Sequence, residues 1–159
     1  MLAEIVSTDR VAAVFLKLKK SGKTVVFTNG CFDIVHAGHV DYMDKAKKLG
    51  DVLVVGVNSD ASVKSIKGKA RPIVTLENRL RLLQGLSSID YLCAFEEDTP
   101  LELIKKVRPN ILVKGEDWKD KGVVGEDVVK ADGGKVELIE LLPGISTGII
   151  IDKILKAYR

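Results

Sequence analysis

The residues best suited to chemistry in this sequence are its two histidines, His36 and His39, which flank Ala37 and Gly38. An imidazole can donate a hydrogen bond to an anion, exchange a proton near neutral pH or bind a metal ion. Gly38 lacks a side chain, so the backbone there can approach a ligand closely. The spacing is compatible with three interpretations: two ordinary surface residues, a zinc site that includes Cys31, or a phosphate-binding site.

The sequence around the histidines predicts the elements that position them. Residues 24–27 form a short β-branched and aromatic run, which is typical of a buried strand. Apolar residues then recur at helical spacing over 40–49, and Gly50 ends the pattern. A strand, a tight loop and a helix start place backbone N–H groups and the positive end of a helix dipole beside the loop, which suits an anion. Zinc is less favoured, because Cys93 is the only other cysteine.

Length and composition indicate a single globular domain that binds a small ligand. The chain has 159 residues, 46% of them apolar, so one domain spanning 1–159 can bury a full core. A net charge of +3 is too small to indicate a nucleic-acid partner, and no apolar run reaches the roughly 20 residues of a membrane span. Two cysteines without a signal-peptide pattern favour a reduced, cytoplasmic location.

Strands and helices are expected to alternate along the whole chain. The pattern predicts strands at 24–27, 52–57, 91–95, 110–113 and 135–141, and helices at 8–20, 40–49, 75–86, 100–108, 121–132 and 147–157. Ser7 or Thr8, Thr99 and Ser146 are the expected caps of three of these helices. The alternation predicts an α/β fold, a Rossmann-like three-layer sandwich around a five-stranded parallel sheet. Neither the dinucleotide fingerprint Gly-x-Gly-x-x-Gly nor a P-loop motif occurs, which argues against a dinucleotide oxidoreductase and a P-loop kinase. The loop with the two histidines stands where those motifs would be expected.

The segment 28–39, with its His-x-Gly-His spacing and its Phe32-Asp33 pair, resembles the cytidylyltransferase-like branch of the nucleotidyltransferase superfamily. The similarity runs from about Thr24 to the C-terminus. It implies that His36 and His39 are catalytic. It also implies that several residues of this segment bind a nucleotide: Thr28, Asn29, Gly30, Phe32, Asp33 and Gly38.

Basic residues after the second strand match a further part of the family pattern. The resemblance implies a flexible clamp over the triphosphate, with Lys67 and Lys69 catalytic and Arg71 on a phosphate; an ordinary exposed basic loop is the alternative. Arg79, on the next helix, corresponds to an arginine near the phosphates and the acceptor. An isolated helical arginine is, however, usually a surface residue.

Two segments in the C-terminal part complete the resemblance. Gly115, Glu116 and Asp117 match an element that borders the base and ribose, and Trp118 beside them is either part of that border or a hydrophobic plug. Near the last helix, the family carries Ser-Thr-Thr or Ser-Thr-Ser. This chain has Ser146-Thr147-Gly148, which implies a weaker nucleotide contact with the backbone N–H still available.

The resemblance implies a specific reaction. AMP would pass from ATP to D-glycero-β-D-manno-heptose 1-phosphate, giving ADP-heptose for lipopolysaccharide core synthesis and releasing pyrophosphate. Mg²⁺ would be held by the phosphates, without direct protein ligands, and the enzyme would be a homodimer. One alternative is a cytidylyltransferase that uses CTP and glycerol 3-phosphate or a similar small phosphate. Another is a nucleotide-sensing module that has lost turnover.

Overall fold

The computed structural model describes residues 1–158. Its strands are β1 (Glu4–Ile5), β2 (Val25–Gly30), β3 (Val52–Asn58), β4 (Tyr91–Phe95), β5 (Ile111–Gly115) and β6 (Lys135–Ile139). Its helices are α1 (Val11–Lys20), α2 (Ala37–Lys47), α3 (Asp60–Lys67), α4 (Leu76–Gln84), α5 (Leu101–Val107), the short 3₁₀ helix η1 (Glu116–Trp118), α6 (Glu126–Ala131) and α7 (Thr147–Ala157).

The strands form one parallel sheet in the order β1-β4-β3-β2-β5-β6. From β2 the chain moves outward through β3 to β4, and it then crosses to β5 and β6 on the other side of β2. The winding therefore reverses between β2 and β5. In open parallel sheets, ligands bind at such a reversal, outside the carboxyl ends of the strands. The topology alone thus directs attention to the ends of β2 and β5.

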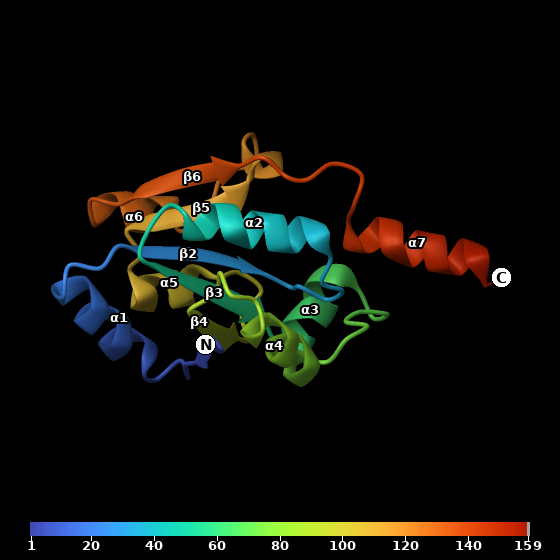
Figure 1. Ribbon diagram of the computed structural model, residues 1–159, viewed down its shortest axis with the longest axis horizontal. Helices are drawn as coiled ribbons and strands as arrows, with labels where there is room; N and C mark the ends of the chain where they lie inside the picture. Colours follow the sequence, from blue (N-terminus) through green and yellow to red (C-terminus); the bar gives the residue numbers. More distant parts are fainter. Residues whose placement is uncertain (159) are drawn as a thin grey trace.

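Helices cover both faces of the sheet, which confirms the three-layer α/β architecture (Figure 1). On one face, α2 and α4 pack through Met43 and Leu83. On the other, α1, α5 and α6 pack through Phe15, Ile104 and Val129. Because both faces are buried, β3 is apolar along most of its length and lacks the alternation of a one-sided sheet.

The prediction of five strands was wrong, because the sheet has six over the described residues. The additional strand, β1, has two residues and pairs with the start of β4. A strand of that length is too short to show alternation in the sequence. The other five strands lie where they were predicted, but β2 extends past Phe27 because its last three residues pair with β3. Thr28, Asn29 and Gly30 therefore end a strand, where the sequence had suggested a loop.

Several helix boundaries also differ from the sequence prediction. Neither Ser7 nor Thr8 caps α1, which begins at Val11; the backbone carbonyl of Ser7 accepts from the Val11 N–H instead. α5 begins at Leu101, after Pro100. α6 covers only residues 126–131 of the predicted 121–132.

The segment expected to be a basic loop contains the helix α3. Ser59 caps it, since its Oγ accepts a hydrogen bond from the Ser62 N–H at 3.1 Å. The helix places Lys67 at its last position, and Gly68 then ends it with a positive φ of 99°. Only residues 68–74 remain as the loop that leads into α4.

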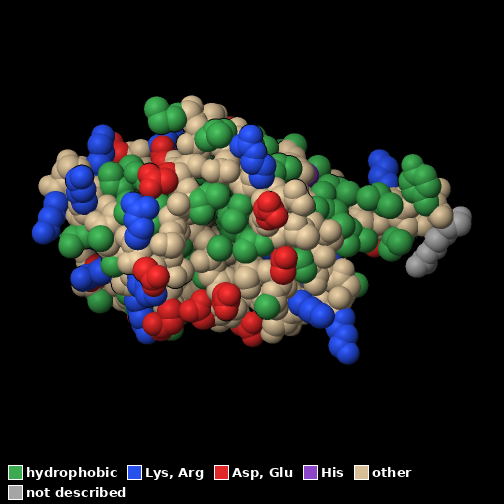
Figure 2. Space-filling view, turned by 90° about the horizontal axis from the view of Figure 1, so that it is seen from below, with side chains coloured by type: hydrophobic (Ala, Val, Ile, Leu, Met, Phe, Trp, Pro, Cys, Tyr) green, Lys and Arg blue, Asp and Glu red, His purple; other side chains and the backbone are tan. Residues whose placement is uncertain are grey.

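The last helix, α7, extends away from the sheet and its covering helices (Figures 1 and 2). Ser146 caps it as predicted, accepting from the Ile149 N–H at 3.1 Å. None of the residues of α7 is buried. Over residues 1–158, no helix combines the length and apolar character needed to cross a membrane.

Candidate active site

A cavity of about 700 Å³ opens at the carboxyl ends of β2 and β5. The β2–α2 loop, the end of α3 with its following loop, the end of β5 with η1, and the start of α7 form much of it. The end of β3 and the segments before α5, before α6 and after β6 complete the lining. Most residues predicted for the site line this cavity, namely Asn29, Gly30, Phe32, Asp33, His36, Gly38, His39, Lys67, Arg71, Gly115, Asp117, Ser146, Thr147 and Gly148. Thr28, Lys69, Glu116 and Arg79 do not line it.

The two histidines stack on each other in the cavity wall. Their ring centroids lie 3.9 Å apart with an interplanar angle of 25°. The Phe32 ring meets the His39 ring edge-on at 5.4 Å. Phe32 is buried and its backbone is left-handed, with φ 50°, a conformation that costs about 1–3 kcal/mol for a bulky residue. Strained backbone of this kind is concentrated at functional sites, and here the left-handed conformation accompanies the contact of the Phe32 ring with His39.

Both imidazoles are uncharged near neutral pH. Burial and the neighbouring His36 lower the pKa of His39 to about 4, and burial also lowers the pKa of His36. The His36 backbone N–H lies 3.4 Å from Nδ1 of His39 and donates to it. The Nε2 of a neutral His39 therefore carries the proton and is a donor. Nδ1 of His36 is buried without a hydrogen-bond partner among residues 1–158, which is typical of a group that meets a ligand.

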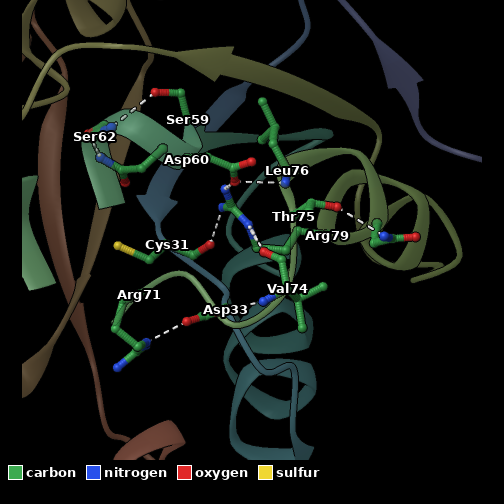
Figure 3. Close-up of polar contacts among 12 residues, drawn as sticks. Cys31, Asp33, Ser59, Asp60, Ser62, Arg71, Val74, Thr75, Leu76 and Arg79 are labelled. Carbon is green, nitrogen blue, oxygen red and sulfur yellow. Dashed lines mark hydrogen bonds and ion pairs between the residues drawn. The ribbon is translucent and has the colours of Figure 1, made fainter. Parts of the chain in front are cut away.

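Asp33 fixes the loop that carries Arg71 (Figure 3). Its side chain is fully buried, and its carboxylate accepts from the Ile73 and Val74 N–H groups at 2.8 Å and from Nε of Arg71. Burial alone would raise the pKa of Asp33, but these hydrogen bonds outweigh it and hold the pKa below its ordinary value. Asp33 thus holds Arg71 at the cavity, and its carboxylate oxygens already accept hydrogen bonds from Arg71, Ile73 and Val74.

Arg79, predicted to lie near the phosphates, is buried in the core and does not line the cavity (Figure 3). Its side chain is fully buried, and its guanidinium donates to the backbone carbonyls of Val74 and Cys31 and to Oδ1 of Asp60. These three bonds join α4 to α3 and to the histidine loop. Arg79 therefore shapes the cavity wall from behind it.

The basic side chains after β3 divide into two groups. Lys67 and Arg71 line the cavity, as predicted. Lys69 is exposed and does not, because Gly68 ends α3 and the chain then turns outward. Of the three basic residues that the resemblance assigned to a clamp over the triphosphate, Lys67 and Arg71 therefore lie at the cavity and Lys69 does not.

The end of β5 forms the opposite wall. Gly115 and Asp117 line the cavity, whereas Glu116 is exposed outside it. Trp118 also lines the cavity, as do Leu141 and Leu142, and Leu141 lies beside Gly115. These apolar side chains suit a flat base better than a phosphate.

Lys114 is a cavity residue that sequence reasoning did not select. It is 7% exposed, donates to Oδ1 of Asn29 and lies 5.2 Å from the centroid of the Trp118 ring. Burial lowers its pKa to about 8, while Asp117 and Cys31 act in the opposite direction. A lysine inside an apolar strand pattern was a signal that it faces a polar feature.

Two helix starts point toward the cavity. α2 begins after His36 and α7 begins after Ser146. The two are joined locally, since Oγ1 of Thr147 donates to the Ile34 carbonyl at 3.3 Å. Helix starts bind anions through free N–H groups and the helix dipole. Thr28, behind the wall, hydrogen-bonds the hydroxyl of Tyr42 at 2.9 Å and so holds α2 to β2.

The zinc interpretation finds no support in the arrangement of the side chains. Among residues 1–158, no three His, Cys, Asp or Glu side chains converge as a metal-ligand set. The cavity instead combines neutral donors, two helix starts and the cations Lys67, Arg71 and Lys114.

Comparison with known proteins places this cavity in a family. The sequence profile of the family described as Cytidylyltransferase-like matches residues 27–150. The bifunctional protein HldE of Geobacter metallireducens is 53% identical over 156 residues, which are 98% of this chain and 32% of that protein. HldE of Syntrophotalea carbinolica is 56% identical over 141 residues, 89% of this chain and 29% of that protein. The chain thus spans about a third of the length of these relatives.

Solved structures share the fold. The lipopolysaccharide core biosynthesis protein from Thermoplasma volcanium matches with a TM-score of 0.61 and 29% identity, over 76% of this chain and 98% of that one. Pantoate-beta-alanine ligase from Francisella tularensis matches with a TM-score of 0.64 over 97% of this chain and 79% of that one; at 16% identity it supports the fold alone. The chain belongs to the cytidylyltransferase-like family of nucleotidyltransferase enzymes.

Proposed function

We propose that the enzyme transfers AMP from ATP to D-glycero-β-D-manno-heptose 1-phosphate, giving ADP-heptose and pyrophosphate. The observation that carries the proposal is the convergence of two neutral imidazoles and two helix starts on one cavity at the reversal of the sheet. A volume of about 700 Å³ lies within the usual range for small-molecule sites. This arrangement fits a polyanion with an attached base.

The geometry suits catalysis by alignment and charge stabilisation. A phosphate oxygen of the acceptor bonds to the α-phosphorus while the bond from that phosphorus to the bridging β-oxygen breaks, and pyrophosphate leaves. The attacking oxygen is already an anion at neutral pH, so no strong base is needed. His36 and His39 donate hydrogen bonds to the triphosphate, while the N–H groups at the start of α7 face the leaving pyrophosphate. Lys67 and Arg71 add positive charge from the end of α3 and the loop after it.

Mg²⁺ would accompany ATP and neutralise part of its charge. Asp33 is a carboxylate at the cavity, but its oxygens accept from Arg71, Ile73 and Val74. The residues present therefore fit a magnesium ion held mainly by phosphate oxygens and water. Asp33 acts on the reaction through the loop that it fixes.

The choice of acceptor rests on the relatives. Two curated relatives above 50% identity are named bifunctional protein HldE, and the resemblance of the sequence motifs points to heptose 1-phosphate. The solved structure at 29% identity is described as a lipopolysaccharide core biosynthesis protein. The apolar wall of Trp118, Leu141 and Leu142 suits the adenine of ATP.

We further propose that the enzyme is a homodimer that works in the cytoplasm. Exposed apolar side chains on and after α7, Ile149, Ile154, Leu155 and Tyr158, offer a surface that a second copy can cover.

A substrate matrix tests the proposed reaction. Pyrophosphate release is measured with ATP, CTP or GTP and Mg²⁺, each combined with heptose 1-phosphate, glucose 1-phosphate or glycerol 3-phosphate. The proposal expects the highest kcat/KM with ATP and heptose 1-phosphate. Preference for CTP with glycerol 3-phosphate would replace it with the cytidylyltransferase alternative. ATP binding without pyrophosphate release for any acceptor would indicate a nucleotide-sensing module.

A further inference from the structure

Lys114 is a buried cation at the cavity floor that carries no ion pair. Its partners are the neutral Oδ1 of Asn29 and the face of Trp118, and no carboxylate forms a salt bridge with it within residues 1–158. Removing an ammonium from water is costly unless an opposite charge compensates. Arg71, by contrast, already has Asp33. The unpaired charge of Lys114 therefore calls for an anionic ligand in the cavity.

The position of Lys114 identifies which part of the ligand it meets. On one side of it, at the end of β2, Asn29 leads into the loop of His36 and His39, which suits the triphosphate. On the other side lie Asp117 and Trp118, in the wall that suits the nucleoside. The group of a nucleotide that lies between its nucleoside and its outer phosphates is the α-phosphate.

We propose that Lys114 is a further catalytic residue, whose ammonium donates hydrogen bonds to the non-bridging oxygens of the α-phosphate. The inference rests on the proposed nucleotidyl transfer. As the acceptor oxygen bonds to the α-phosphorus and pyrophosphate leaves, negative charge grows on those oxygens. Lys114 stabilises that charge without giving up a proton, and Asn29 and the Trp118 ring hold its Nζ in place.

The test compares Lys114→Met, which keeps the length of the side chain without its charge, with Lys114→Arg, which keeps the charge. Lys119→Met is the control, because Lys119 is exposed outside the cavity on the same segment. Lys114→Met is expected to lower kcat for pyrophosphate release by about 10²–10³-fold. Lys119→Met is expected to match the wild type. A kcat within threefold of the wild type for Lys114→Met overturns the assignment.

A pH profile distinguishes a Lys114 ammonium that acts on the substrate from a Lys114 side chain that only supports the structure. Asp117 and Cys31 are the ionisable groups that act on Lys114. The other charged or titratable side chains that line the cavity are Asp33, His36, His39, Tyr42, Lys67, Arg71 and Asp98. Since Lys114 must be protonated, wild-type kcat/KM should fall as the pH rises through about 8. Lys114→Arg should move this decline to higher pH. An unchanged decline in Lys114→Arg contradicts the proposal.

Binding of α,β-methylene ATP with Mg²⁺, measured by calorimetry, separates this inference from the proposed function. Lys114→Met should bind the analogue at least about tenfold more weakly than the wild type and Lys119→Met. If the wild type turns over no substrate pair, the proposed function fails, and the contact of Lys114 with the nucleotide is then judged from the affinities alone. Equal affinities for the wild type, Lys114→Met and Lys119→Met overturn that contact.

Discussion

Two stacked imidazoles resist being protonated together. Their pKa values are lowered, to about 4 for His39, so between about pH 4 and 6.5 the unfolded chain binds more protons than the folded one. The free energy of unfolding should therefore fall as the pH decreases from 6.5 to 4, by about 3 kcal/mol at most from His39. The lowered pKa of Asp33 contributes in a separate window, below its ordinary value of 3.8.

Urea unfolding at several pH values measures this effect. His39→Asn should retain more of its stability than the wild type as the pH is lowered from 6.5 to 4, because one of the two depressed groups is gone. Parallel curves for the two proteins would show that the stacked pair is not the source of the pH dependence.

The buried guanidinium of Arg79 has a structural role that can be distinguished from ligand binding. Arg79→Met leaves the carbonyls of Cys31 and Val74 without their donor, and should lower the free energy of unfolding by about 3 kcal/mol. Chemical denaturation checks this value, with the exposed Arg81 changed to Met as the control. If Arg79→Met is as stable as the wild type but binds ATP more weakly, Arg79 contacts the phosphates, as the family resemblance implies.

At the scale of the element, the start of α7 departs from the family pattern at Gly148. A Cβ there would have Ser146 Oγ at 3.8 Å as its nearest neighbour, so a larger residue fits. Gly148→Ser should tighten ATP binding severalfold by adding a hydroxyl beside the free N–H groups. Gly148→Ala is the matched variant, because it also replaces the glycine, with a gain in helix propensity of about 1 kcal/mol that exceeds the gain from serine, but adds no hydroxyl. Equal ATP affinity in the two variants would remove any role for the missing hydroxyl.

The strand–loop–helix unit around the histidines was predictable because its signals are local. A β-branched run, a glycine between two histidines and a helical repeat are all contained in about 25 residues. α3 was not predictable in the same way, since lysines at 64 and 67 and the following Gly68 read as a loop. Its capping Ser59 depends on the end of β3, which the sequence placed one residue too early.

At the scale of the whole molecule, most residues that the family resemblance selected line one cavity, but their burial could not be predicted from the sequence. Arg79 is a core residue because Asp60 and the Cys31 carbonyl meet it, and these are 19 and 48 positions away. Lys114 was not predicted as a site residue for the same reason. It is positioned by its hydrogen bond to Asn29, which lies 85 positions away in the sequence. Contacts over such separations depend on the order of the strands, and β1 and the reversal at β2 become visible only with the sheet.

The exposed apolar surface of α7 bears on assembly. Ile154 on α7 is 50% exposed and Tyr158 just after it is 87% exposed. The helix extends from the body (Figure 2). Light scattering of the purified chain should give twice the monomer mass, and Ile154→Glu should shift it toward the monomer, because a charge there cannot be buried without cost. Lys153→Ala, on the same helix, should leave the mass unchanged. A monomeric wild type contradicts the proposed homodimer.

The most direct measurement of the central claim is pyrophosphate release by His39→Ala, with ATP and heptose 1-phosphate as substrates and the melting temperature recorded alongside. The His39 imidazole donates to the reacting triphosphate, so kcat should fall by about 10²–10³-fold while the protein stays folded. Turnover close to that of the wild type in a folded His39→Ala protein would contradict the claim that the paired histidines of this cavity carry the reaction.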